Sequence, residues 1–507
     1  MKFARYHQLL LFSLALLLYV GSAFQPALLD DADAANAETA REMIERHDWV
    51  TMHMNGVRFL EKAPLMYWAI AGSFKLFGVS TFTARLPLAL AALALVLTVY
   101  RFGVWMSGER AGFYAGLSLC VGLGTYIFTR ALIFEVILTL WITLAFFIFL
   151  KVYYEELNPN WIYGCYICLA AAVLSKALIG VLFPLGTLFL FVWLTHGWKR
   201  VRQMRLLSGA LLFLLLAVPW HILAGLRNEK FFWFYFINEH VKRFLGTRLP
   251  MDYDTVPLLF FWLGHLIWLF PFSIFLPLVL TRLRPLLRRP TAREDQLRLL
   301  ALLWFLVIVG FFSFSTRQEY YTFPAFPALA LLLGDALAMG EREKSRLVIW
   351  GQGVLLALGL LSAAVLGYLL WLSRHAAPTS DIAQLLTSNP DDYRLSLGHL
   401  SDLTTAAFAA LRFPAAGAAL TLGLGFALAF GLRWWRRDYA ASCATALTCA
   451  GFIFFVHFAF GVFNPVLSSY PLAEAIQPRL KPEDIIAFYG QYQNHPSVGF
   501  YLQRQVL

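Results

Sequence analysis

Charged residues are scarce in this chain of 507 residues. Asp, Glu, Lys and Arg together make up 14% of it, whereas hydrophobic residues make up 60%. A soluble globular protein has about 25% charged and about 45–50% apolar residues, so a soluble enzyme is excluded. Intrinsic disorder is excluded as well, because disordered chains are rich in charge and poor in apolar residues. We therefore expect a membrane protein that crosses the bilayer many times.

Cysteine and several familiar catalytic motifs are also scarce or missing. The five cysteines all lie inside apolar runs, so the sequence indicates no disulfide framework. Cys165 and Cys168 form a CxxC-like pair, but the hydrophobic sequence around them favours a membrane span over a metal or redox site. The chain has no Walker motif, no HExxH and no GxSxG. ATP-driven transport and nucleotide-sugar chemistry are therefore without support.

Long apolar runs are abundant, and a membrane helix needs about 20 mainly apolar residues. They predict an all-α polytopic protein with thirteen transmembrane helices. The first run also has the pattern of a signal peptide, but we expect it to remain as a span. The runs cover residues 8–24, 81–100, 111–129, 131–152, 161–175, 177–195, 206–224, 257–280, 298–315, 322–339, 347–372, 413–432 and 440–463.

The distribution of Lys and Arg predicts how these spans are oriented. If the N-terminus is cytoplasmic, the basic clusters of the short loops all fall on the cytoplasmic side, as the positive-inside rule requires. The formal net charge of +11 then reports topology, and a nucleic-acid partner is an unnecessary hypothesis. The predicted location is the bacterial inner membrane, with the C-terminus in the periplasm. Four long segments reach the periplasmic side, 25–80, 225–256, 373–412 and 464–507.

Two domains are expected from this layout. Residues 1–463 form the transmembrane domain, with 25–80 as the first periplasmic loop, containing amphipathic helices, and 225–256 as the second. Residues 464–507 form a short periplasmic C-terminal segment. Its "IIAFYG" and "SVGFYLQ" stretches are typical of short strands, which predicts a small α/β segment.

Acidic residues gather where the first loop leaves the membrane. Asp30, Asp31 and Asp33 precede a helical run that ends near Arg46. One interpretation is helix capping and complementation of the helix dipole, worth about 0.3–1 kcal/mol per charge. The other is a catalytic base or a metal ligand. A cap needs only one acid, so three leave both interpretations open.

A further motif in the same loop leads to a family resemblance. Glu61 and Lys62 stand in "LEKAPLMYW", a stretch that suits the membrane interface. The order of the acidic residues, "AREM", "DWV", "NGV", "EKAPLMYW" and "ARLP" resembles the first extracytoplasmic loop of the glycosyltransferase C superfamily. Within it, the resemblance is greatest to the bacterial branch related to protein O-mannosyltransferases and to the lipid A aminoarabinose transferase.

The resemblance implies an inverting transferase whose active site faces the periplasm. Its donor would be a sugar on a polyprenyl phosphate, and its acceptor a lipid, protein or glycan. The first-loop acids would supply the general base. The usual Asp-Glu pair is replaced here by "DDAD", so that Asp31 is the first choice and Asp30 and Asp33 flank it. Glu135, at the outer start of the fourth span, would orient or assist, or else form a structural pair with Arg130.

The donor phosphate would meet cationic and polar side chains from three segments. Lys62 suits phosphate as a point charge, and Arg can offer bidentate hydrogen bonds. "NEHVKRFLGT" resembles the second conserved loop of the family, and "STRQEYYTFP" its turn near the lipid phosphate. The predicted donor-binding residues are Glu61, Lys62, His240, Arg243, Arg317, Tyr320 and Tyr321, with Glu239 as a further candidate.

Two questions stay open from the sequence. Some relatives use a divalent cation, for which Asp31 and Glu61 are the candidate ligands, although nothing in the sequence requires one. A secondary transporter or a flippase of lipid-linked sugars would use similar polar groups without chemistry. The sequence has no inverted repeats, and its acids cluster in one loop, which favours the transferase.

The predicted orientation can be tested with reporter fusions. A reporter fused after Arg342 should be cytoplasmic, and one fused after Asp484 should be periplasmic, because the positive loops stay inside. Protease accessibility of the two tags in intact spheroplasts and in lysed cells measures this. Two tags on the same face of the membrane would contradict the topology.

Overall fold

A computed structural model describes residues 2–155, 158–251, 255–283, 286, 290–377, 404–487 and 495–506. The chain divides into two compact units, residues 1–20 with 39–344 and residues 21–38 with 345–507. The described residues are mostly helical, with one short antiparallel hairpin of β1 (His53–Met54) and β2 (Val57–Arg58). The prediction of an all-α polytopic protein is confirmed.

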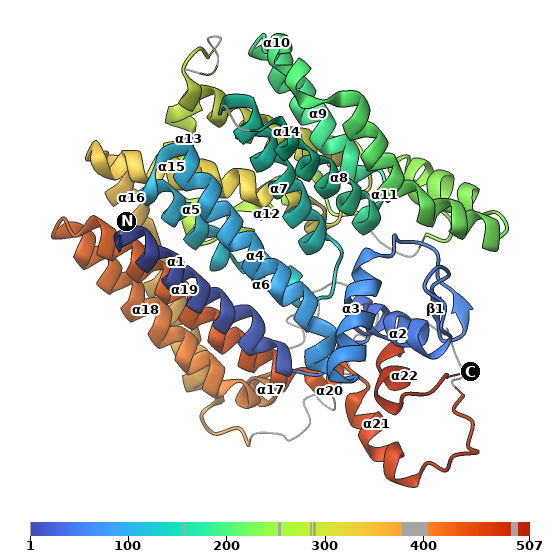
Figure 1. The fold of residues 1–507 in the computed structure, drawn as a ribbon. Helices are drawn as coiled ribbons and strands as arrows, with labels where there is room; N and C mark the ends of the chain where they lie inside the picture. The colour runs from blue at the N-terminus through green and yellow to red at the C-terminus, as the bar shows by residue number, and fades with distance from the viewer. Residues whose placement is uncertain are drawn as a thin grey trace. The chain divides into compact units, whose positions relative to one another are not determined.

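The first unit contains a set of closely packed helices. α4 (Thr81–Ser107), α5 (Glu109–Cys120) and α15 (Phe326–Arg342) lie side by side, and α1 (Lys2–Ala15) packs on α4 and α5 (Figure 1). A Cβ on Gly112 would lie 2.4 Å from Val104 N, and one on Gly334 would lie 2.4 Å from Ala111 O. Such close approach of backbones needs residues without side chains, as is common between membrane helices.

A second set of helices in this unit leads to the loops. α7 (Glu135–Tyr154), α8 (Ile162–Lys176) and α9 (Ile179–Leu194) pack in succession, α11 (Leu206–Arg227) contacts α8, and α14 (Arg293–Ser313) contacts α9. The first loop adds α2 (Ala32–Glu45), which begins in the second unit, and α3 (Leu65–Phe77), which packs on α4. The expected helices of the first loop are therefore present.

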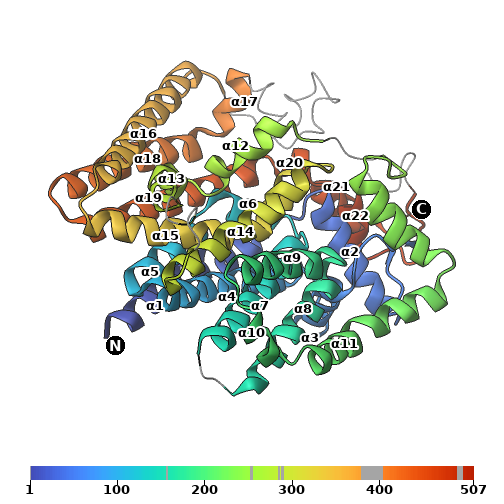
Figure 2. The same cartoon turned by 90° about the horizontal axis from the view of Figure 1, so that it is seen from above.

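In the second unit, three long helices lie side by side (Figure 2). α18 (Arg412–Trp434) packs between α16 (Arg346–Ser373) and α19 (Asp438–Val462). The rest of this unit is made of shorter helices and turns. They are α17 (Thr405–Ala410), α20 (Asn464–Leu467), α21 (Tyr470–Ile476) and α22 (Pro496–Leu502).

The strand predicted over "SVGFYLQ" is wrong, because these residues form α22. Pro496 at the first helical position favours a helix start there, since its fixed φ suits the helix and its missing N–H is not needed. The described part of "IIAFYG" contributes Ile486, which forms an isolated parallel bridge with Val506. Residues 488–494 lie outside the described residues. The domain boundary predicted between residues 463 and 464 stays a prediction.

Nine described helices are long and apolar enough to cross a membrane, and two bent helix pairs bring the number to eleven if each pair is one span. The bent pairs fall on two of the predicted spans, 111–129 and 257–280. α5 and α6 (Leu123–Arg130) meet at 49°, and α12 (Leu258–Trp268) meets the helix ending at Leu283 at 105°. Pro271 lies in the second break and has no N–H with which to continue a helix. The total of thirteen spans stays a prediction.

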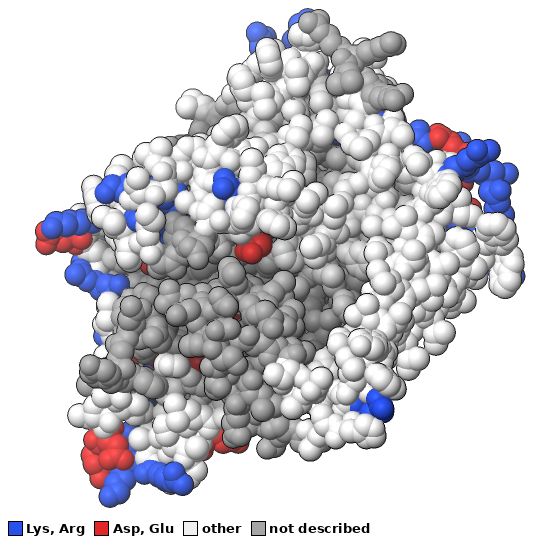
Figure 3. All heavy atoms as spheres, turned by 180° about the vertical axis from the view of Figure 1, so that it is seen from behind, with Lys and Arg blue, Asp and Glu red and all other residues white. Residues whose placement is uncertain are grey.

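Side-chain exposure agrees with a membrane environment. In the face drawn in Figure 3, Lys, Arg, Asp and Glu are sparse over a broad surface of other residues. α11 and α16 carry rows of exposed large apolar residues, among them Leu207, Leu211, Leu215, Leu361 and Trp371. Contiguous exposed apolar surface is costly in water but is what lipid contact requires.

Replacing a glycine at the close approach of α4 and α5 should destabilise the first unit. We expect Gly112→Ala to lower the free energy of unfolding by about 1–3 kcal/mol, because the added Cβ would meet backbone atoms of α4. Gly310→Ala in α14 is the matched control, since a Cβ there meets no atom within 4 Å. Thermal unfolding of the detergent-solubilised protein measures both. Equal midpoints for the two variants would contradict the packing.

Candidate active site

The second loop is folded back on itself by local contacts. The π-helix η5 (Trp233–Lys242) is followed by a turn at Gly246, whose φ of +71° lies in the left-handed region that glycine adopts without strain. Asn238 then holds the returning chain, since its Nδ2 donates to Leu249 O at 2.8 Å and its Oδ1 accepts from Leu249 N at 3.1 Å. This return places Arg248 beside Glu239.

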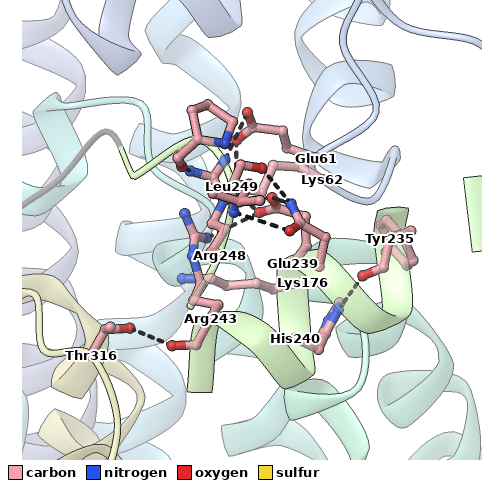
Figure 4. Close-up of polar contacts among 12 residues, drawn as sticks. Glu61, Lys62, Lys176, Tyr235, Glu239, His240, Arg243, Arg248, Leu249 and Thr316 are labelled. Carbon is pink, nitrogen blue, oxygen red and sulfur yellow. Dashed lines mark hydrogen bonds and ion pairs between the residues drawn. The ribbon is translucent and has the colours of Figure 1, made fainter. Parts of the chain in front are cut away.

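Arg248 is the centre of a buried ion-pair network (Figure 4). Its Nε donates to Glu239 Oε1 at 2.5 Å, its NH2 lies 3.0 Å from Glu61 Oε1, and its NH1 donates to Pro250 O at 2.9 Å. The side chains of Arg248 and Glu239 are each 1% exposed. Because Arg248 contacts both Glu61 and Glu239, it joins the first loop to the second. Removing one partner of such a buried pair costs about 3–5 kcal/mol of folding free energy.

Two further cations face the same carboxylates at longer distances. Lys62 Nζ lies 3.5 Å from Glu61 Oε2 and 3.9 Å from Glu239 Oε2, and Arg243 NH1 lies 3.5 Å from Glu239 Oε2. Charge-assisted hydrogen bonds are about 2.7–2.9 Å long. Both cationic side chains are 19% exposed. Lys62 and Arg243 therefore share carboxylates loosely and remain accessible, unlike the buried Arg248.

Burial and neighbouring charges shift the pKa values of Lys62 and Glu61 in this cluster. Desolvation by burial and the nearby Arg243 lower the pKa of Lys62 to about 8, against the opposing influence of Glu61 and Glu239. Burial raises the pKa of Glu61, but Lys62 and Arg248 outweigh it and hold that pKa below its usual value. At neutral pH the cluster therefore contains a carboxylate and a mostly protonated lysine.

A second ion pair joins the C-terminal end of α8 to the N-terminal end of α7. Lys176 closes α8 and pairs with Glu135, the first residue of α7. The Lys176 ammonium also lies over the rings of Tyr320 and Tyr321, 5.5 and 4.7 Å from their centroids. Glu135 thus forms an ion pair with Lys176, and its predicted role in catalysis stays a prediction.

His240 lies beside the cluster but is held neutral. Burial lowers its pKa to about 4, and Lys62 and Arg243 contribute to the shift. Its Nδ1 lies 2.5 Å from Tyr235 O. A neutral ring that donates from Nδ1 leaves Nε2 as an acceptor, which does not suit a phosphate oxygen. The structure therefore gives no charge-based reason for His240 to contact the donor phosphate.

Arg317 is used to hold a turn. Its Nε donates to Val256 O at 2.7 Å, and its NH1 donates to Ser313 O and Ser315 O at 3.3 Å each. The backbone N–H of Val256 donates in return to Arg317 O at 3.0 Å. Its predicted contact with a phosphate stays a prediction.

The three aspartates of the first loop belong to the second unit and differ in their surroundings. Asp33, in the first turn of α2, is buried and accepts a hydrogen bond from Leu29 N through Oδ2 at 3.0 Å. Asp30 accepts from Ser497 N at 3.0 Å and from the Ser469 hydroxyl. Asp31 is solvent-accessible. Desolvation by the surrounding protein raises the pKa of Asp31. A hydrogen bond from Ala32 N lowers this pKa, and the charge of Asp33 raises it.

The structure thus brings Glu61, Lys62, Glu239 and Arg243 together in one cluster. All four are predicted from the sequence as candidates for donor binding. Sequence reasoning missed Arg248 and Lys176. The signal for Lys176 was a lone lysine between two apolar spans, and that for Arg248 was a basic residue in a loop that topology does not constrain. Among the described residues, no three His, Cys, Asp or Glu side chains are grouped to hold a metal ion. Asp31 and Glu61 lie in different units, so their shared cation stays a prediction.

Comparison with known proteins identifies relatives of this chain. The sequence profile of the family described as dolichyl-phosphate-mannose-protein mannosyltransferase matches residues 61–223. An undecaprenyl phosphate-α-4-amino-4-deoxy-L-arabinose arabinosyl transferase of Aeromonas salmonicida is 29% identical over 380 residues, which are 71% of this chain and 65% of the relative. An uncharacterized protein of Aquifex aeolicus is 27% identical over 304 residues, 60% of this chain and 66% of that protein.

A solved structure shares the fold. ArnT from Cupriavidus metallidurans, determined with bound undecaprenyl phosphate, matches with a TM-score of 0.80 and 23% sequence identity. The match covers 98% of this chain and 85% of ArnT. By sequence, the chain spans a little under two thirds of the length of the curated relatives that it matches.

Proposed function

Because the chain belongs to the glycosyltransferase C superfamily and is related to protein O-mannosyltransferases and to ArnT, we propose that it is an inverting glycosyltransferase. Its donor is a sugar linked to a polyprenyl phosphate, and its acceptor is a hydroxyl or phosphate of a lipid, protein or glycan. The reaction takes place at the periplasmic face of the bacterial inner membrane. The sugar is a hexose or a pentose.

The observation that carries this proposal is the loosely paired cationic cluster. Four cations, Lys62, Lys176, Arg243 and Arg248, face three carboxylates, Glu61, Glu135 and Glu239, which gives this group of side chains a formal charge of +1. Lys62 and Arg243 are partly exposed, and the distances to Glu61 and Glu239 given above are 3.5–3.9 Å. An incoming phosphate can therefore bind these cations without breaking the buried Arg248 pairs.

The chemistry follows from this assignment. The bond between the anomeric carbon and the phosphate oxygen breaks, and its electron pair leaves with the polyprenyl phosphate. Lys62 and Arg243 stabilise the charge that develops on that oxygen. The acceptor oxygen forms the new bond on the opposite side of the anomeric carbon, which inverts its configuration, and its proton passes to a carboxylate.

We assign the role of general base to Asp31. Asp33 is buried and accepts a hydrogen bond from Leu29 N, and both oxygens of Asp30 accept hydrogen bonds from the C-terminal residues. Asp31 is accessible, and its raised pKa makes its carboxylate a better proton acceptor. Lys176 and Glu135 support the cluster as a structural pair.

Binding of the donor phosphate should depend on pH through Lys62. The protonated lysine binds phosphate, and its pKa is about 8, so the charged fraction falls as the pH rises above 8. The Kd for undecaprenyl phosphate should therefore increase about tenfold between pH 7 and pH 9. Lys62→Arg should abolish this increase, because arginine stays charged. Isothermal titration in detergent micelles measures the Kd.

The same measurement at pH 7 tests the individual cations. Lys62→Ala and Arg243→Ala should each weaken binding of undecaprenyl phosphate about tenfold to hundredfold, the worth of a charge-assisted hydrogen bond. Lys230→Ala, an exposed lysine of the same loop, is the matched control and should bind normally. Unchanged affinity in both cluster variants would remove them from the phosphate site.

Asn variants of the three aspartates test the base. Loss of a general base costs about 10²–10⁴-fold in rate, and Asn keeps the hydrogen-bond-accepting oxygen while losing basicity. We expect Asp31→Asn to fold and to bind undecaprenyl phosphate normally but to lose transfer by this factor. Asp33→Asn and Asp30→Asn should retain most of the activity, because an amide oxygen can accept their hydrogen bonds.

The assay uses undecaprenyl phosphate-α-4-amino-4-deoxy-L-arabinose as the first donor probe and lipid A as the first acceptor probe. If the protein were a transporter or a flippase, all three variants would move lipid-linked sugar at the wild-type rate and none would form a glycosidic product. Full transfer by Asp31→Asn would disprove the proposed base.

A further inference from the structure

The C-terminal residues form a small packed element within the second unit. α21 and α22 lie side by side (Figure 1). They enclose an apolar core of Ala473, Val498, Leu502 and Val506, with Ile476, Ile486 and Tyr501 packed against it. We call the described residues 464–487 and 495–506 the C-terminal clamp.

The clamp binds the backbone of the first loop just before Asp31. Leu28 N donates to the hydroxyl of Tyr501 at 2.7 Å, and Leu28 O accepts from the hydroxyl of Ser468 at 2.6 Å. Asp30 N donates to Leu467 O at 2.8 Å. The backbone of residues 28–30 is thus fixed by groups that lie more than 430 positions later in the chain.

The Asp30 carboxylate completes this attachment. Its Oδ1 accepts from Ser497 N at 3.0 Å, and its Oδ2 accepts from the Ser469 hydroxyl. Ser469 N in turn donates to Ser497 Oγ at 3.0 Å, and His495 Nδ1 lies 2.9 Å from Ser469 Oγ. Both carboxylate oxygens therefore serve the contact between the two segments, and the serine hydroxyl that reaches Asp30 is itself positioned.

We propose that the C-terminal clamp positions the catalytic base, with Asp30 and Ser469 as positioning residues. This inference rests on the proposed function, in which Asp31 is the base. Asp31 follows Asp30 directly, so release of the Asp30 carboxylate would free the backbone that carries Asp31. Misplacement of a reacting group by about 1 Å can cost about 10²-fold in rate, even when all catalytic residues are present.

The experiment measures attachment and turnover separately, with the full chain in lipid nanodiscs. Ser469→Ala removes the hydroxyl that donates to Asp30, and Asp30→Ala removes both acceptors. Deuterium exchange over residues 26–34 should become about tenfold faster in both variants, because local opening no longer breaks these hydrogen bonds. With the donor and acceptor probes named above, kcat should fall about tenfold to hundredfold. KM for the donor should stay within about twofold.

Conservative variants separate positioning from a general loss of stability. Ser469→Thr keeps the hydroxyl, and Asp30→Asn keeps an acceptor for Ser497 N, so both should restore most of kcat and of the protection. Glu474→Ala, on the exposed side of α21, is the control within the clamp and should behave as wild type.

Each outcome decides one statement. Unchanged exchange over residues 26–34 in Ser469→Ala and Asp30→Ala would disprove the attachment. Faster exchange with unchanged kcat would show that the clamp is attached but does not position the base, and would overturn the inference. A wild-type protein that folds but transfers no sugar would count against the proposed function alone, because the exchange measurement needs no turnover and still tests the attachment.

Discussion

The buried pair of Arg248 and Glu239 is the contact on which the arrangement of the candidate site depends. Two charged side chains that are 1% exposed are tolerated only if each satisfies the other. Here the second loop must fold back at Gly246 to bring them together, and Arg248 reaches on to Glu61 in the first loop. The pair of Arg248 and Glu239 holds the two loops together. The partly exposed cations Lys62 and Arg243 are therefore not needed for this structural role.

The helical fold could be predicted from the sequence because its cause is local. A run of about 20 apolar residues has to become a helix in lipid, where every backbone group needs an internal partner. The bends at residues 121–122 and 269–271 could not be predicted in the same way, because a membrane helix tolerates Gly and Pro when neighbours satisfy the freed groups. α22 escaped prediction since a short stretch such as "SVGFYLQ" is ambiguous between strand and helix, and its packing partners decide.

The candidate site could be predicted in part. Glu61, Lys62 and Arg243 stood out because charged residues beside apolar spans are few and their motifs are specific. Arg248 and Lys176 did not, because each acquires its role from a partner distant in sequence, Glu61 and Glu135 respectively. The sequence shows which charges exist, but which of them become buried and paired depends on the return of the loop and on helix packing.

The aspartates of the first loop show why residue type alone does not assign chemistry. Asp30, Asp31 and Asp33 are the same acid within four positions, and their residue type alone left both capping and catalysis open for the cluster. A carboxylate can be tied to neighbouring groups by the hydrogen bonds that its oxygens accept. Asp33 and Asp30 are held in this way, one by Leu29 N and the other by Ser469 and Ser497. Two of the acids therefore fix the chain, and the accessible acid between them is the one that we propose as the base.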